Sequence, residues 1–190
     1  MSPTGKPNMY PQYNANSPRI EQSAGPRGCL DAGEVVVMDT VESPQAVRMS
    51  SKIGNRRYSH STALGKVLPA GLNDKEVQRL LRVKGTPKLT EQTLVSKRAV
   101  LAEVQKVRPQ GWALDNRENE IDGRCIAAAI VGPGERVVAA LSVSGPVFRM
   151  DMARARPGSR AARRLRRDLA RGARVRVVKL EGWRGSFRRG

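Results

Sequence analysis

The chain has 190 residues, which suits one domain or one domain with tails, and its formal net charge is +18. Aromatic residues make up only 4% of it. Its apolar runs are shorter than the roughly 18–20 residues of a membrane helix and its N-terminus is polar, so we expect neither a membrane span nor a secretory signal. The spacing of Cys29 and Cys125 fits neither a zinc motif nor a disulfide framework, which favours a reducing, cytoplasmic setting.

Composition divides the chain into three segments. Residues 1–33 are rich in Pro, Gly, Ser and Asn and predict a disordered leader. Residues 34–150 have the apolar patterning of a folded domain, whereas residues 151–190 form a basic, atypical C-terminal tail with 14 basic and three acidic side chains. Such a tail either faces solvent or binds polyanions without reading sequence, since no DNA-reading motif accompanies the charge. The arginines that would carry this binding are Arg163, Arg164, Arg166 and Arg167.

The first half of the folded segment predicts a hairpin followed by helices. The β-branched run Glu34–Asp39 predicts a strand, and we expect Ala46–Ser50 to pair with it across residues 42–44. Asn73, with Glu76 three residues later, makes a capping-box pattern and predicts the start of a helix.

The second half predicts one helix and three strands. The helix is expected over Thr90–Val107, with Pro109 ending it. Strands are expected at Gly111–Asp115, Cys125–Val131 and Arg136–Ser144, and the Gly-Pro-Gly-Glu loop between the last two indicates an antiparallel hairpin. These elements predict an α+β domain with a mostly antiparallel sheet and helices packed on it.

Small polar side chains gather on one face of the last two predicted strands. Ser142 and Ser144 project to the same side, and Cys125 shares a face with neighbouring alanines on the preceding strand. They line either a small polar cavity or an ordinary solvent-facing edge. The opposite face of the last strand is wholly apolar and is expected to be the core: Val137, Ala139, Leu141 and Val143.

A second pattern lies at residues 60–66. Ser61 or Thr62 can cap a helix that starts there, and the free N–H groups of its first turn favour an anion. The alternative is a capped helix with nothing bound.

Enzyme and metal hypotheses find little support. His60, Asp115 and Ser142 supply the residue types of a hydrolase triad, but no nucleophile-elbow motif accompanies them. His60, Cys125 and a carboxylate lack the spacing of a zinc site, and no nucleotide-binding motif is present. We therefore expect no catalytic residue, metal or cofactor. The three acidic residues before the penultimate strand are expected to be solvated: Glu118, Glu120 and Asp122.

Several segments resemble, in order, the effector-binding domain of IclR-type bacterial transcriptional regulators. The opening EVVVMDTVES and the run AVRMSSKIGNRRYSHSTALGKVL, with its His-x-x-Ala-x-Gly-Lys signature, are similar to the family's first segments. The next two segments that are similar to the family, in chain order, are TPKLTEQTL and VLAEVQKVRPQGWALD. The most specific match is GRCIAAAIVGPGERVVAALSVSGP, and the resemblance covers residues 34–150.

The resemblance implies a GAF-like fold that senses a small carboxylate or aromatic acid between the sheet and the helix after the Gly-Lys signature. It implies that the backbone amides of Ala63 and Leu64 meet the acid's carboxylate, and that Met49 walls the pocket. The residues expected to hold the polar groups of the acid are Asp115, Cys125, Ser142 and Ser144.

The sequence departs from the family pattern at four places. Asp122 stands where the family usually has glycine, and Pro69 where it usually has an aliphatic residue. The 33 residues before the sensor show no winged helix-turn-helix, and the C-terminal segment is arginine-rich rather than amphipathic, so we expect a truncated or frame-shifted reading of a regulator gene. The expected function is a non-enzymatic acid sensor that self-associates or pairs with an intact family member. The alternative is a non-specific polyanion binder that uses the tail.

Overall fold

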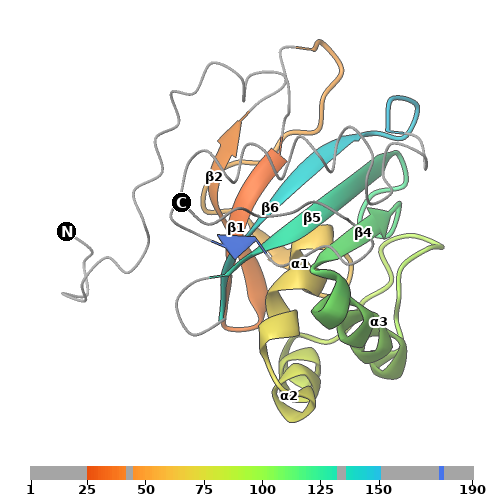
Figure 1. Ribbon diagram of the computed structural model, residues 1–190. Helices are drawn as coiled ribbons and strands as arrows, with labels where there is room; N and C mark the ends of the chain where they lie inside the picture. Colours follow the sequence, from red (N-terminus) through yellow and green to blue (C-terminus); the bar gives the residue numbers. More distant parts are fainter. Residues whose placement is uncertain (1–24, 42–44, 132–135, 151–175, 178–190) are drawn as a thin grey trace.

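A computed structural model describes residues 25–41, 45–131 and 136–150 and the backbone of 176–177. Its strands form one sheet in the order β3-β2-β1-β6-β5-β4, all neighbours are antiparallel, and β7 pairs with the end of β5 (Figure 1). The bounds are β1 Gly25–Asp31, β2 Glu34–Val41, β3 Arg56–Tyr58, β4 Trp112–Asn116, β5 Gly123–Val131, β6 Val137–Pro146 and β7 Arg176–Val177. The predicted α+β class is confirmed.

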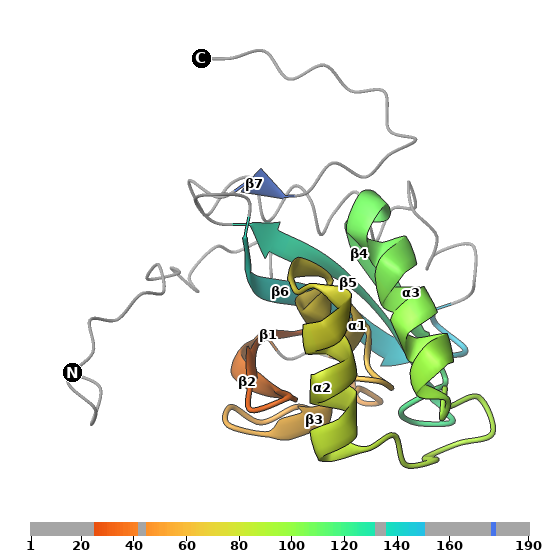
Figure 2. The ribbon, with the colours of Figure 1, turned by 90° about the horizontal axis from the view of Figure 1, so that it is seen from below.

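The helices gather on one side of this sheet (Figure 2). They are α1 Ala63–Val67, the 3-10 turn η1 Leu68–Gly71, α2 Asp74–Lys84 and α3 Lys97–Gln110. The predicted capping box opens α2: Asn73 Oδ1 accepts from the Glu76 N–H at 3.0 Å, and Glu76 Oε2 accepts from the Asn73 N–H at 2.8 Å. Pro69 lies at the start of η1, where a missing N–H costs no helical hydrogen bond. Within the described residues, no helix has the length and hydropathy of a membrane span.

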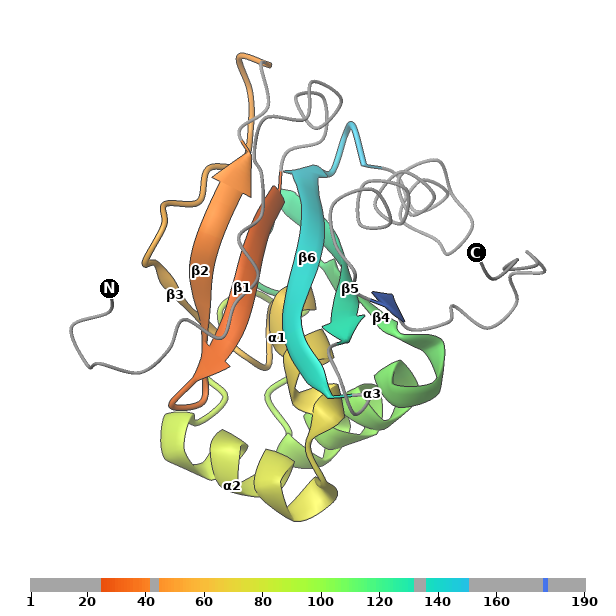
Figure 3. The same cartoon turned by 60° about the vertical axis from the view of Figure 1, so that its left-hand side comes forward.

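The predicted leader ends too late, because β1 lies inside it. β1 pairs with β2 along its whole length and with β6 at Arg27 and Gly28 (Figure 3). Its Gly- and Pro-containing sequence carries no strand pattern, so its order comes from the two neighbouring strands. Residues 1–24 lie outside the described part of the chain.

The prediction that Ala46–Ser50 pairs with β2 is also wrong. A two-residue turn joins β1 to β2, and both of its residues have positive φ, Ala32 at 47° and Gly33 at 86°. This is the backbone that tight antiparallel hairpins prefer. The other neighbour of β2 is β3, while residues 46–50 form no strand.

The long helix starts later and ends later than predicted. Residues 90–93 form a turn in which the Thr93 hydroxyl accepts from the Thr90 N–H at 2.8 Å, and α3 begins only after Ser96. Pro109 lies within the last turn, where it removes one backbone N–H donor but does not end the helix. The helix ends at Gly111, which has φ 74° and donates its N–H to Val107 O at 2.7 Å.

The core lies on the face of the sheet opposite to the one predicted. The helix-covered face carries Ala127, Ala129 and Ala140, which pack against α1 together with Val35 of β2. Small side chains allow the short helix to approach the strands closely. Of the predicted apolar face of β6, only Val137, beside an irregularity in the β5–β6 register, packs against this core. Leu141 packs with Ala128 in a separate cluster, and Ala139 and Val143 are half-buried.

Candidate functional site

Helix α1 lies unusually close to the chain that precedes it, because Gly65 has no side chain. A Cβ atom at Gly65 would sit 2.4 Å from both the Cα and the carbonyl oxygen of Ser59. Thr62 caps this helix: its hydroxyl accepts from the Gly65 N–H at 3.0 Å and donates to Tyr58 O at 3.0 Å. This packing holds the start of α1 over the sheet, against β4, β5 and β6.

A pocket opens where the start of α1 faces three adjacent strands. Asp115 of β4, Cys125 of β5 and Ser144 of β6 are direct cross-strand partners and form one row. The next row on the same face carries Ser142, whose side chain is 3% exposed. All four residues line the pocket, so the serines face a cavity rather than solvent.

The remaining walls come from segments far apart in sequence. Ala63 and Leu64 line the pocket at the start of α1. Met49 lines it too and packs on Gly123, where a Cβ would lie 2.8 Å from the Met49 Cε. The structure thus gathers all seven predicted ligand-binding residues around one cavity. Among the further lining residues is one basic side chain that no pattern in the sequence indicated, Arg57 of β3, which the pairing of β3 with β2 brings to this face.

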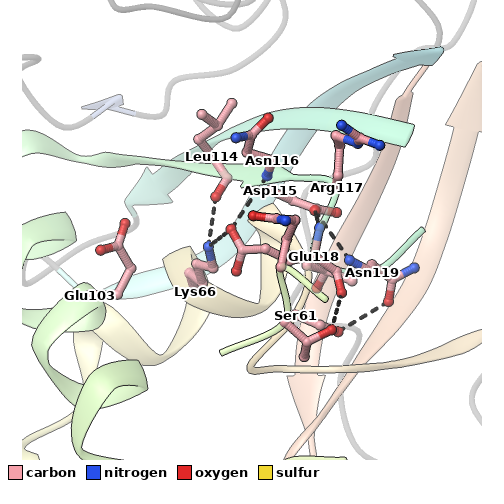
Figure 4. A network of polar contacts seen from close by, with 12 residues as sticks. Ser61, Lys66, Glu103, Leu114, Asp115, Asn116, Arg117, Glu118 and Asn119 are labelled. Carbon is pink, nitrogen blue, oxygen red and sulfur yellow. Dashed lines mark hydrogen bonds and ion pairs between the residues drawn. The ribbon is translucent and has the colours of Figure 1, made fainter. Parts of the chain in front are cut away.

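Beside the pocket, α1 is fastened to the β4–β5 connection by a buried ion pair (Figure 4). The Lys66 ammonium is 1% exposed, donates to Glu118 Oε1 at 2.6 Å and to Leu114 O at 2.7 Å. Burial raises the pKa of Glu118, although Lys66 acts in the opposite direction. The expectation that Glu118 is solvated is therefore wrong, because the connection folds back under α1.

The same connection is held from the far side by two threonines. Thr93 donates its hydroxyl hydrogen to Glu118 O at 2.6 Å, and Thr90 donates to Arg117 O at 2.7 Å. Ser61, just before α1, donates to Asn119 Oδ1 at 3.1 Å. The connection between β4 and β5 is thereby fixed relative to α1 and the start of the pocket.

Asp115 lies at the end of the polar row, beside this connection. Its Oδ1 accepts from the Glu118 N–H at 2.8 Å and from the Asn119 N–H at 3.3 Å. Burial, reinforced by the nearby Glu118 carboxylate, raises the pKa of Asp115 to about 7, despite these two hydrogen bonds. Near neutral pH the pocket therefore contains a carboxyl that exists in both protonation states.

Cys125 is held in its thiol form. Burial and the adjacent Asp115 carboxylate raise the pKa of Cys125. Because the thiolate is the reactive species, this environment disfavours nucleophilic chemistry and leaves a weak hydrogen-bond donor in the pocket.

The residues of the hypothetical triad and zinc site do not come together. His60 is 1% exposed and its Nε2 lies 3.0 Å from Pro87 O, away from the residues that line the pocket. Burial lowers the pKa of His60, so the neutral ring donates to that carbonyl. The residues that the structure describes hold no group of three metal-ligating side chains. The four tail arginines, Arg163, Arg164, Arg166 and Arg167, lie outside the described residues.

Comparison with known proteins identifies the family. The family described as "Bacterial transcriptional regulator IclR C-terminal" matches residues 27–171. The chain is 40% identical to the HTH-type transcriptional regulator XynR of Escherichia coli K12 over 124 residues, which is 65% of this chain and 49% of XynR. It thus spans about half the length of this relative.

Solved structures agree with the fold. The C-terminal domain of the E. coli regulator KdgR has a TM-score of 0.67 and 31% identity, covering 80% of this chain and 86% of that domain. The inducer-binding domain of the Acinetobacter regulator PobR, a double mutant in complex with 3-hydroxybenzoic acid, has a TM-score of 0.70 over 82% of this chain and 97% of its own. At 23% identity, this second likeness shows the fold alone. The chain belongs to the IclR family of bacterial transcriptional regulators and carries the C-terminal, effector-binding domain of that family.

Proposed function

We propose that this chain senses a small carboxylate or aromatic acid in the pocket between the sheet and α1. The observation that carries the proposal is the row Asp115–Cys125–Ser144, with Ser142 beside it, which opens into a cavity under a helix rather than onto solvent. Convergent hydroxyl, thiol and carboxyl groups beside apolar side chains in a cavity are the arrangement that orients a small polar ligand.

The start of α1 supplies the contacts for the acid group itself. The N–H groups of the first helical turn have no acceptor within the helix, and Ala63 and Leu64, whose amides the family resemblance assigns to the carboxylate, both line the pocket. Met49 closes the opposite side above Gly123. The PobR domain, whose fold is similar, was solved with 3-hydroxybenzoic acid, which makes an aromatic acid a reasonable member of any test panel.

The proposal includes a non-enzymatic role. Cys125 is held as a thiol and His60 is turned away from Ser142, so the cavity holds no activated nucleophile. We also propose that the chain acts in the cytoplasm and that acid binding changes how it associates with itself or with an intact family member.

Thermal unfolding of the full chain with a panel of small acids tests the proposal. The panel contains 2-oxo acids, 2-hydroxy acids and benzoic acids, each in excess. A ligand at 100 times its Kd adds about 2.7 kcal/mol to the free energy of unfolding, which gives a clear rise in Tm. Ser142→Ala is expected to lose this rise.

The matched control is Ser96→Ala. This serine caps α3 outside the pocket, so its loss lowers the Tm of the free protein but leaves the acid-induced rise intact. A rise that survives in Ser142→Ala places the acid elsewhere, and a panel without any rise contradicts the proposed function.

A further inference from the structure

The pocket contains a basic side chain that has no counter-ion. Among the described residues that line the pocket, Arg57 alone is basic. The residue is half-buried, and its guanidinium forms no hydrogen bond or ion pair with any residue that the structure describes.

Its neighbour Arg56 shows what an ordinary surface arginine does on this strand. Arg56 points to the other side of β3 and is exposed, and it pairs with Asp31 at 2.5 Å and with Glu34 at 3.2 Å. The two arginines are consecutive residues of β3, and their side chains lie on opposite faces of the strand. On the face that borders the pocket, the Arg57 guanidinium contacts no carboxylate of the described residues, although Asp115 and Glu120 line the same pocket.

Arg57 and Asp115 line the pocket from the two edge strands of the main strand order. Arg57 is on β3, directly across from Val35 of β2, whereas Asp115 is on β4 at the other edge of the main strand order. Val35 and Val37, both almost fully buried, line the pocket on β2. In strand order the lining passes from the cationic Arg57 on β3 through an apolar middle, the two valines of β2, to the hydroxyl, thiol and carboxyl groups on β6, β5 and β4.

We propose that Arg57 selects a diacid: one acidic end of the effector lies at α1 and the polar row, and a second carboxylate pairs with Arg57 across the apolar middle. This inference rests on the proposed function and names the class of acid within it. A guanidinium binds a carboxylate through two parallel N–H donors, a geometry that a monoacid held at the other end leaves unused.

Two acids of equal chain length test the diacid hypothesis on the full chain. 2-Oxoglutarate and 2-oxopentanoate carry the same 2-oxo acid head and five carbons, and only the first has a distal carboxylate. By titration calorimetry at low salt we expect 2-oxoglutarate to bind about tenfold more tightly than 2-oxopentanoate. This is the gain in affinity that one partly exposed, charged hydrogen-bonded pair provides. Arg57→Met keeps the aliphatic stem and should reduce this ratio to about one, whereas Arg57→Lys should keep part of it.

Arg56→Met is the matched control, and it should leave the tenfold preference unchanged. Equal binding of the two acids by the unmodified chain overturns the inference, as does a preference that survives in Arg57→Met. Each of these results leaves acid sensing itself intact. If neither of these acids nor any other in the panel binds, the proposed function fails, and the diacid inference fails with it.

Discussion

Two polar centres lie on either side of helix α1, and they differ in whether their groups border the cavity. The Lys66 centre is closed: its ammonium contacts Glu118 and the Leu114 carbonyl, and almost none of it is exposed. The Asp115 centre is open, because the carboxyl shares its face with Cys125 and two serines at the edge of a cavity. Both centres are buried, so burial alone does not distinguish a structural group from a binding group.

The difference shows how one short segment both supports the fold and lines the pocket. Residues 60–66 supply the buried lysine on one side of α1 and the pocket-lining turn on the other. Asp115 and Glu118 are joined through the Asp115 Oδ1 and the Glu118 N–H, so the closed centre fixes the position of the open one. The predictions below separate the two centres by the size and the pH dependence of their effects.

The largest effect is expected from breaking the closed centre. Glu118→Ala leaves the Lys66 ammonium buried with only a carbonyl partner, so we expect a loss of about 3–5 kcal/mol in the free energy of unfolding at pH 7. Urea denaturation measures it. Lys66→Met/Glu118→Leu removes both charges and should lose less than Glu118→Ala alone. A loss below about 1 kcal/mol for Glu118→Ala contradicts a structural role for the pair.

A substitution in the open centre should raise the free energy of unfolding above pH 7, whereas one in the closed centre lowers it. The pKa of Asp115 is raised from 3.8 to about 7, so the folded chain keeps a proton that the unfolded chain releases near pH 4. The contribution of Asp115 to stability is therefore greatest below pH 4, falls as the pH rises from about 4 to 7, and levels off above that. Asp115→Asn removes this dependence and should stabilise the chain above pH 7 by up to about 4 kcal/mol.

Urea denaturation between pH 4 and 8 measures the difference between the two chains. The control is Glu120→Gln, which changes an exposed carboxyl of the same connection and should keep the slope of the unmodified chain. Equal slopes in Asp115→Asn and the unmodified chain would show that Asp115 ionises normally in the folded state.

Most of the fold was predictable because local patterns fixed it. The capping box at Asn73 and the β5–β6 hairpin formed as expected. β1 was missed because its order comes from pairing with β2 and β6, which leaves no trace in a Gly- and Pro-rich run. The buried face of β6 was mistaken because bulky apolar residues usually mark the core, whereas here a close helix selects alanines.

The candidate site was predictable in composition but not in electrostatics. The serines and Cys125 follow from strand alternation, and the amides of α1 from the family resemblance. The buried pair of Lys66 with Glu118 spans 52 positions, and no local pattern links two residues so far apart. Arg57 was missed for the same reason, since its face depends on the pairing of β3 with β2.

The smallest effect is expected at the outer support of the closed centre. Thr93→Val keeps the shape of the side chain but removes the hydroxyl that donates to Glu118 O and accepts from the N–H groups of Leu89 and Thr90. Thr90 still donates to Glu118 O, but the partly buried N–H groups of Leu89 and Thr90 lose their acceptor, which should cost about 1–3 kcal/mol. Thr86→Val, which loses an exposed hydrogen bond to Val95 O, should cost about 0.5 kcal/mol or less. Urea denaturation of both variants at pH 7 measures the difference. Equal losses would mean that Thr93 does not fix the connection, and the stability of the closed centre would then come from the Lys66–Glu118 ion pair alone.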